Sequence, residues 1–275
     1  MWTRDDFLAA VPLGILGMIH LQPLPGSPRW GGDLDAVRAD ALRDADALVE
    51  AGFGAAMVEN YHDVPFFPDA VPAHTVAALT ALVAAVRARH PRLAVGVNVL
   101  RNDAAAALGV AAATGACCVR VNVHAGAAAT DQGPLAGRAW HTLRLRRELG
   151  LERVGILADV RVKHARPLVE RPLAEEAADL RLRGLADALI VTGPATGAPA
   201  APDDLRAVRA ALPDCPLLVG SGATAASVAE LLRLADGCIV GSSLQAADPA
   251  TGRAAVDAGR ARAFHAAATA APRKD

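Results

Sequence analysis

Short apolar runs rich in β-favouring residues alternate along this chain with longer segments of helical period, and this alternation limits the choice of fold more than any other feature. Such an order of strands and helices builds a parallel sheet covered by helices. The expected strands are residues 14–20, 55–60, 93–99, 117–123, 154–159 and 188–192, with one more inside each of 217–224 and 236–244. The expected helices are 4–10, 34–51, 73–90, 103–114, 137–149, 173–183 and 202–211, with one more after each of the last two strands.

The last two expected strands each run into a Gly-Ser turn, at residues 220–222 and 241–242. Glycine lets the backbone approach a ligand closely, and free N–H groups at the start of a following helix attract an anion. Two such turns in succession match the phosphate site after strands 7 and 8 of a TIM (β/α)8 barrel. The main alternative, an open doubly wound sheet, would place its glycine-rich turn after the first strand, where this chain has the proline-rich residues 21–32. We therefore predict the α/β class and a single (β/α)8 barrel domain over residues 1–275.

Composition and charge exclude several classes of protein. The chain is 53% hydrophobic and has a net charge of −1 without a basic block, which argues against nucleic acid as a partner. Four cysteines without C-x-x-C spacing lie in or beside apolar runs, as the buried thiols of a reducing compartment do: Cys117, Cys118, Cys215 and Cys238. Residues 1–10 are too charged for a signal peptide, and no apolar stretch is long enough to span a bilayer. These features predict a soluble, cytoplasmic protein, and leave a homo-oligomer open.

Asparagine, glutamine and lysine are scarce in this arginine-rich chain, yet they gather at one end of the expected barrel. That end holds the carboxyl termini of the strands, where the active sites of TIM barrels lie. Carboxylates near strand ends suit acid–base chemistry, and histidines and amides can orient a substrate. The candidate catalytic residues are Glu59, Asp159, His20, His124, Lys163, Asn98 and Asn122. For each histidine the alternative is a structural hydrogen bond in a loop.

Arg120 alternates with Asn122 and His124 on the fourth expected strand. Residues two apart on a strand share a face, and the outer face must pack on helices, so these three side chains are expected inside the barrel. A buried arginine needs a carboxylate partner, which Glu59 or Asp159 can supply. Such a pair can serve the site or be purely structural, and the residues leave both interpretations open.

Lys163 follows the fifth expected strand by four residues and is one of two lysines in the chain. It can form a Schiff base or bind a second anionic group, and the alternative is a solvated loop residue. Asp131, in the long loop 125–135, is expected to act as a lid residue, with Arg120 and His164 in supporting positions. A His/Glu/Asp site for a divalent metal is compatible with this rim, but no spacing requires one, so no metal or other cofactor is predicted.

The Gly-Ser turns and the end of the sixth expected strand define the predicted phosphate site. Its residues are Gly220, Ser221, Gly222, Gly241, Ser242, Thr192 and Gly193. The alternative is that the turns are only tight joints between strand and helix. Two turns in the order that the barrel requires favour anion binding.

Six motifs along the chain, with the two Gly-Ser turns, resemble those of the BtpA/SgcQ family. They are residues 18–28 (MIHLQPLPGSP), 96–103 (GVNVLRND), 120–126 (RVNVHAG), 130–133 (TDQG), 159–164 (DVRVKH) and 191–197 (VTGPATG). The resemblance covers nearly the whole chain and departs from the family at residues 245–248, where a lysine-containing segment is expected. It implies a TIM barrel akin to ribulose-phosphate-binding barrels, in a family named for a factor of photosystem I biogenesis that is peripheral to thylakoid membranes. It implies no particular reaction and supplies no catalytic residue.

Two functions from different classes follow. The first is an enzyme that binds a small phosphorylated metabolite, a sugar phosphate or nucleotide-like compound, and performs acid–base isomerase, epimerase or lyase chemistry. A Schiff-base aldolase using Lys163 is a variant of it. The second, suggested by the resemblance, is a non-enzymatic assembly factor for photosystem I, which predicts an exposed apolar or basic patch facing a membrane. The near-neutral sequence shows no such patch, so the enzyme is the favoured interpretation.

Overall fold

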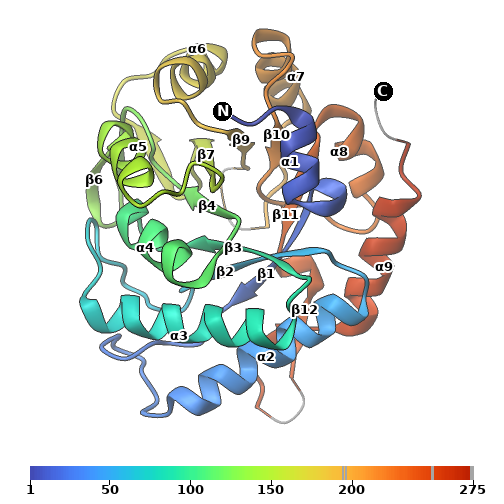
Figure 1. Cartoon of the computed structure of the whole chain (residues 1–275). Helices are drawn as coiled ribbons and strands as arrows, with labels where there is room; N and C mark the ends of the chain where they lie inside the picture. Colours follow the sequence, from blue (N-terminus) through green and yellow to red (C-terminus); the bar gives the residue numbers. More distant parts are fainter. Residues whose placement is uncertain (194, 196, 249–250, 273–275) are drawn as a thin grey trace.

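Eight parallel strands close into a barrel in the computed structural model of the chain (Figure 1), which describes residues 1–193, 195, 197–248 and 251–272. The barrel strands are, in spatial order, β1 (Ile15–His20), β11 (Gly237–Val240), β10 (Leu217–Val219), β9 (Ala188–Val191), β7 (Gly155–Arg161), β4 (Cys118–Val121), β3 (Ala94–Asn98) and β2 (Ala55–Glu59). Closure is made by β1, which pairs in parallel with both β2 and β11. The predicted (β/α)8 barrel is confirmed.

Helices that follow the strands surround the barrel (Figure 1). They are α2 (Leu34–Glu50), α3 (Ala73–Arg89), α4 (Ala104–Thr114), α5 (Ala139–Glu148), α6 (Leu173–Ala178), α7 (Pro202–Ala211), α8 (Val228–Leu234) and α9 (Ala258–Thr269). The helix expected over residues 173–183 is α6 running into a π-helical turn, Asp179–Arg183. The start of α2 is where the sequence predicts it, because the Asp33 side chain accepts hydrogen bonds from the backbone N–H groups of Asp35 and Ala36.

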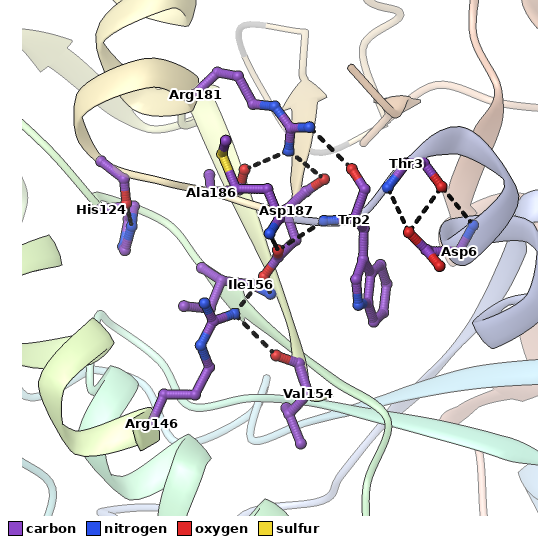
Figure 2. A network of polar contacts seen from close by, with 12 residues as sticks. Trp2, Thr3, Asp6, His124, Arg146, Val154, Ile156, Arg181, Ala186 and Asp187 are labelled. Atoms are coloured by element: carbon purple, nitrogen blue, oxygen red, sulfur yellow. Dashed lines mark hydrogen bonds and ion pairs between the residues drawn. The ribbon is translucent and has the colours of Figure 1, made fainter. Parts of the chain in front are cut away.

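The amino-terminal end of the barrel is closed by the helix α1 (Arg4–Ala10) and the residues before it. Trp2 and Phe7 pack against apolar side chains from the strands. Asp187, directly before β9, accepts a hydrogen bond from the Trp2 backbone N–H at 3.0 Å and pairs with Arg146 at 2.5 Å (Figure 2). This network ties the start of the chain to β9 and α5, at the end opposite the predicted site.

Two segments expected as loops form a small antiparallel sheet at the carboxyl-terminal end of the barrel. In it β5 (Ala127–Thr130) pairs with β6 (Gly133–Ala136) and with β8 (Ala165–Pro167). The strands are short and rich in alanine, which has little β preference, so their sequence does not predict them. The hairpin turn depends on Gly133, whose φ of 95° suits glycine. The long loop predicted over residues 125–135 is therefore an ordered hairpin beside the barrel mouth.

A second hairpin that the sequence does not predict, β12 (Gln245–Ala247) with β13 (Ala254–Val256), follows the last barrel strand. Over the described ranges, no helix is both long and apolar enough to cross a membrane. The tail 271–275 is expected to fray, and its residues 273–275 lie outside the described part of the chain. Pro194 and Thr196, in the motif after β9, also lie outside it.

Candidate functional site

A row of polar side chains lines the barrel mouth where neighbouring strands end at the same level. In the sheet register, His20 of β1 pairs with Glu59 of β2. Glu59 pairs in turn with Asn98 of β3, and Asn98 with Arg120 of β4. Glu59 Oε2 accepts a hydrogen bond from Asn98 Nδ2 at 2.5 Å, and His20 Nε2 lies 3.8 Å from Glu59 Oε1. Residues in register on parallel strands project to the same face, so the fold brings these predicted residues together.

Arg120 forms a buried ion pair with Asp159, which decides between the two carboxylates that the sequence left open. The guanidinium donates to both Asp159 oxygens, at 2.9 and 3.2 Å, and Asn122 Nδ2 donates to Asp159 Oδ2 at 2.6 Å. The side chains of the pair are 3% and 0% exposed. Within the described residues, no lysine or arginine nitrogen lies within 4.0 Å of Glu59. Glu59 is therefore the freer carboxylate in the mouth. The Asp159 carboxylate is fixed by Arg120 and Asn122, and the charge of Arg120 balances its own.

His20 is neutral near pH 7. Burial lowers its pKa to about 4, although the nearby Glu59 carboxylate acts in the opposite direction. Gln245 Nε2 lies 3.0 Å from His20 Nδ1, and because an amide NH2 group can only donate, Nδ1 accepts. A neutral imidazole that accepts at Nδ1 carries its proton on Nε2, the nitrogen that faces Glu59. Tyr61 stacks on the ring with 4.2 Å between centroids and holds its plane.

The lowered pKa of His20 predicts a loss of stability in mild acid. The pKa is about 4 in the folded chain and about 6.5 in the unfolded one, so between these values the unfolded chain binds more protons. The free energy of unfolding therefore falls as the pH drops from 6.5 to 4. In urea unfolding at pH 7 and pH 4.5, the wild type should lose about 2–3 kcal/mol more than His20→Asn. An equal loss in both proteins would contradict this.

Lys163 lies between two cavities of the barrel mouth. One, of about 540 Å³, is lined by Glu59, Arg120 and Asn122 among others. The other, of about 290 Å³, is lined by His20 and the two Gly-Ser turns. Burial lowers the pKa of Lys163, against the opposite influence of Glu59. Because Lys163 lines both cavities, they adjoin at its side chain.

The smaller cavity is the candidate anion site. Five predicted residues line it: Gly220, Ser221, Gly222, Gly241 and Ser242. Gly222 has a φ of 74°, and a Cβ there would lie 2.3 Å from Pro199 Cα, so the turn requires glycine. Ser243 Oγ donates to the Ala223 carbonyl at 2.7 Å and joins the two turns. Ser242 is exposed and lies where a ligand can reach it.

The helices expected directly behind the two turns are displaced or shortened. After β10, α8 starts only at Val228, and β11 is followed by a three-residue helix, Ser242–Leu244. An anion in this cavity would therefore meet the N–H groups of the turns themselves rather than the end of a long helix.

Two residues predicted for the phosphate site, Thr192 and Gly193, do not line this cavity but a third one of about 620 Å³, which shares Asp131 and His164 with the cavity of about 540 Å³. Thr192 Oγ1 donates to the Arg161 carbonyl at 2.6 Å, and the Gly193 N–H donates to Ser221 Oγ at 2.7 Å. The Ser221 hydroxyl donates in turn to the Ala198 carbonyl at 2.9 Å. These groups join loops to one another. Thr192 and Gly193 do not line the cavity of the Gly-Ser turns but border its first turn, because Gly193 bonds Ser221 and a Cβ on Gly220 would lie 2.6 Å from Thr192 Cγ2. The Ser221 side chain is engaged by these loop contacts.

His124 lies apart from the other candidate catalytic residues, contrary to the sequence-based expectation. The strand β4 ends at Val121, so the alternation that would place His124 inside the barrel stops before reaching it. Its ring is fully buried, with Nε2 at 2.8 Å from the Gly184 carbonyl, near the network around Asp187 (Figure 2). Burial lowers the pKa of His124. This geometry fits the alternative considered for each histidine, a structural hydrogen bond, rather than a catalytic role.

The β5–β6 hairpin places Asp131 at the cavity of about 540 Å³ that Glu59 lines, called the larger cavity below because it is the larger of the two that share Lys163. Asp131 lines it together with His164 and Lys163. Arg101 lines the same cavity, and its guanidinium donates to the Lys163 carbonyl at 2.7 Å. The sequence does not single out Arg101, because one more arginine carries no signal in an arginine-rich chain. Over the described part of the chain, no three His, Cys, Asp or Glu side chains lie close enough together to hold a metal ion.

Comparison with known sequences gives consistent matches. A family model described as the BtpA family matches residues 13–270. The photosystem I biogenesis protein BtpA of Synechocystis sp. is 46% identical over 84% of this chain and 80% of its own length. An uncharacterised protein of Thermococcus kodakarensis is 47% identical over 83% of this chain and 85% of its own. An uncharacterised mitochondrial protein of Caenorhabditis elegans is 32% identical over 84% of each chain.

Several solved structures share the fold. A structure described as native KDPGal has a TM-score of 0.58 at 19% identity and covers 94% of this chain and 96% of that one. The 3-hexulose-6-phosphate synthase of Salmonella typhimurium has a TM-score of 0.57 at 16% identity, covering 93% and 98%. Phosphoribosyl anthranilate isomerase of Thermus thermophilus has 0.54 at 13%, with the same coverage. At these identities the likeness shows the barrel fold and nothing finer.

Proposed function

We propose that this chain, which belongs to the BtpA family, is an enzyme that binds a small phosphorylated metabolite across its barrel mouth. The observation that carries the proposal is the position of Lys163 between the cavity of the Gly-Ser turns and the cavity that holds Glu59. A phosphate in the first cavity would leave the rest of a small substrate beside the free carboxylate. The named structural neighbours 3-hexulose-6-phosphate synthase and phosphoribosyl anthranilate isomerase make phosphorylated substrates a natural class to test.

The proposed chemistry is proton abstraction from a carbon next to a carbonyl group. Glu59 takes the proton, and Asn98 holds that carboxylate through its 2.5 Å hydrogen bond. His20 Nε2–H and the Lys163 ammonium donate to the carbonyl oxygen, which becomes negative as the carbon–hydrogen electron pair moves into the enolate. For a substrate with a hydroxyl group on that carbon, return of the proton to the former carbonyl carbon completes an isomerisation, while the hydroxyl proton passes to the enolate oxygen and the hydroxyl oxygen becomes the new carbonyl. Delivery of a proton from the Lys163 ammonium to the opposite face of the same carbon, with Glu59 keeping the first proton, completes an epimerisation.

Breakage of a carbon–carbon bond beside the same carbonyl makes the reaction that of a lyase. In that case Glu59 takes the proton of the hydroxyl group whose carbon departs as an aldehyde, and the bonding electrons form the enolate. In the Schiff-base variant, Lys163 forms the imine instead, and its lowered pKa favours the neutral amine which that step needs. In each version Asp159 acts as a positioning residue through Arg120 and Asn122.

Sugar phosphates should stabilise the wild type, and a negative charge at Ser242 should remove the effect. A ligand at 100 times its Kd stabilises by roughly 2.7 kcal/mol, which raises the melting temperature of a chain of this size by about 5–10 °C. Ser242→Glu places a carboxylate at the exposed edge of the cavity and should weaken binding by at least about tenfold through charge repulsion. Thr251→Asp, in the exposed turn between β12 and β13, adds the same charge at a residue that lines neither cavity and should bind like the wild type. If no phosphorylated compound shifts the wild type, the proposal fails.

The Synechocystis relative, named as a photosystem I biogenesis protein, supports a second candidate function, an assembly factor without catalysis. This alternative requires neither a free carboxylate nor an anion cavity in the barrel mouth. It therefore predicts that conservative changes at Glu59 leave the function unaltered, and the Glu59→Gln experiment in the Discussion separates the two.

A further inference from the structure

We propose that Arg101 forms a second anion site in the larger cavity, and that the substrate carries a second acidic group, a carboxylate or a second phosphate. This inference rests on the proposed function, because it takes the first phosphate to lie at the Gly-Ser turns. It narrows the substrate class to compounds with an acidic group at each end and the reacting carbons between them.

The first observation is that Arg101 is buried and has no carboxylate partner in the part of the chain that the structure describes. The residue is 5% exposed, and within the described residues no carboxylate oxygen lies within 4.0 Å of its guanidinium. One guanidinium nitrogen donates to the Lys163 carbonyl at 2.7 Å, and Nε is buried without a hydrogen-bond partner. A buried cation in this state is costly unless an anion compensates it.

The other arginine that is buried among the described residues shows what compensation looks like. The Arg120 side chain is 3% exposed and meets Asp159 at 2.9 Å. Arg101 departs from this pattern, and it does so in the wall of a cavity of about 540 Å³ that a ligand can enter.

The second observation is the charge around that cavity. Lys163 lines it and, within the described residues, also has no ion pair, and the exposed Arg29 stands at its edge. The carboxylates that face the cavity are Glu59 and Asp131, both farther than 4.0 Å from Arg101. Burial lowers the pKa of Arg101, and the negative charges of Asp159, Asp131 and Glu59 act in the opposite direction at longer range without pairing with it. An oxyanion on the ligand can therefore occupy the position beside Arg101 that a carboxylate partner would fill. A guanidinium can donate two hydrogen bonds to the oxygens of a carboxylate or a phosphate.

The two anion sites lie in different cavities that share Lys163. The Gly-Ser turns lie in the smaller cavity, Arg101 lies in the larger one, and Lys163 lines both. A chain-like substrate held at both ends would pass Lys163 and Glu59 with its middle carbons. Binding at both ends of the substrate would position the reacting carbon against Glu59. Binding energy from groups that do not react then contributes to the rate of the chemical step.

Matched pairs of ligands test the inference by isothermal titration calorimetry. Aldonic acid phosphates of four to six carbons, such as 6-phosphogluconate, are compared with the alditol phosphates of equal length, such as sorbitol 6-phosphate. Fructose 1,6-bisphosphate against fructose 6-phosphate tests a second phosphate in place of a carboxylate. The wild type should prefer the two-acid member of at least one pair by about tenfold or more. Arg101→Met should reduce that preference to less than about twofold while it binds the one-acid member as the wild type does.

Control variants make the outcomes distinct. Arg206→Met removes an exposed arginine on α7 and should keep the wild-type preference, and Arg101→Lys should keep part of it. If every pair binds the wild type equally, or if Arg101→Met keeps the preference, the second anion site is refuted while the first stands. If no phosphate ester binds the wild type at all, the proposed function fails and takes this inference with it. Should Arg101→Met not fold, Arg101→Gln takes its place with the same expected result.

Discussion

Arg120→Met should lower the free energy of unfolding by about 3–5 kcal/mol, the largest stability effect that we expect from a single polar residue of the site. The substitution leaves the Asp159 carboxylate fully buried, with Asn122 as its remaining donor. Uncompensated burial of a charge costs far more than the loss of an exposed ion pair, since water cannot reach the carboxylate. Denaturation in urea, with the slope of the transition checked for two-state behaviour, measures the difference.

The control for this prediction is an ion pair of similar length at the surface. Arg206 meets Asp203 at 2.7 Å, but the two side chains are 59% and 94% exposed. Arg206→Met should therefore change the stability by no more than about 0.5 kcal/mol. The double variant Arg120→Met/Asp159→Leu removes both buried charges and should be more stable than Arg120→Met alone. If Arg120→Met were within 1 kcal/mol of the wild type, the pair would not be acting as a buried ion pair.

Glu59→Gln should reduce turnover of the substrate by about 10²- to 10⁴-fold, the range for removal of a general base. Glutamine keeps the size of the side chain and an oxygen that can accept from Asn98, so folding and affinity for phosphate esters should stay within about threefold of the wild type. Glu230→Gln, an exposed change on α8, should leave turnover unaltered. Steady-state rates on a compound found in the thermal screen provide the measurement.

Three outcomes for the Glu59→Gln variant distinguish a general base, a Schiff-base mechanism and an assembly role. Loss of turnover with retained binding supports Glu59 as the base. Retained turnover in Glu59→Gln, together with loss in Lys163→Met, would instead favour the Schiff-base variant. If Glu59→Gln and the wild-type chain equally restored photosystem I in a Synechocystis strain lacking its relative, the assembly role would gain over catalysis.

The order of strands and helices could be predicted because it depends on local pattern. Apolar runs such as those of β2 and β10 are buried on both faces, and only a parallel sheet covered by helices offers that environment. The sheet of β5, β6 and β8 could not be predicted in the same way. Its strands are a few alanine-rich residues each, and what orders them is pairing with one another and packing on Val123 and Val162.

The residues at strand ends were likewise accessible from the sequence, because a barrel brings the ends of its strands to one rim. His20, Glu59 and Asn98 meet there in register as this rule requires. His124 does not lie on this rim, because β4 stops at Val121, one residue after Arg120, where the chain turns away to begin the next hairpin.

The sequence by itself determined the barrel, the polar rim and the place of the two Gly-Ser turns, because these follow from periodicity and from what glycine alone permits. Only the tertiary structure decided that Asp159 rather than Glu59 pairs with Arg120, and that no carboxylate of the described residues pairs with Arg101. The physical reason is that an ion pair depends on distances of 3–4 Å between side chains far apart in sequence. Such distances are set by how neighbouring strands align and by how loops close over them.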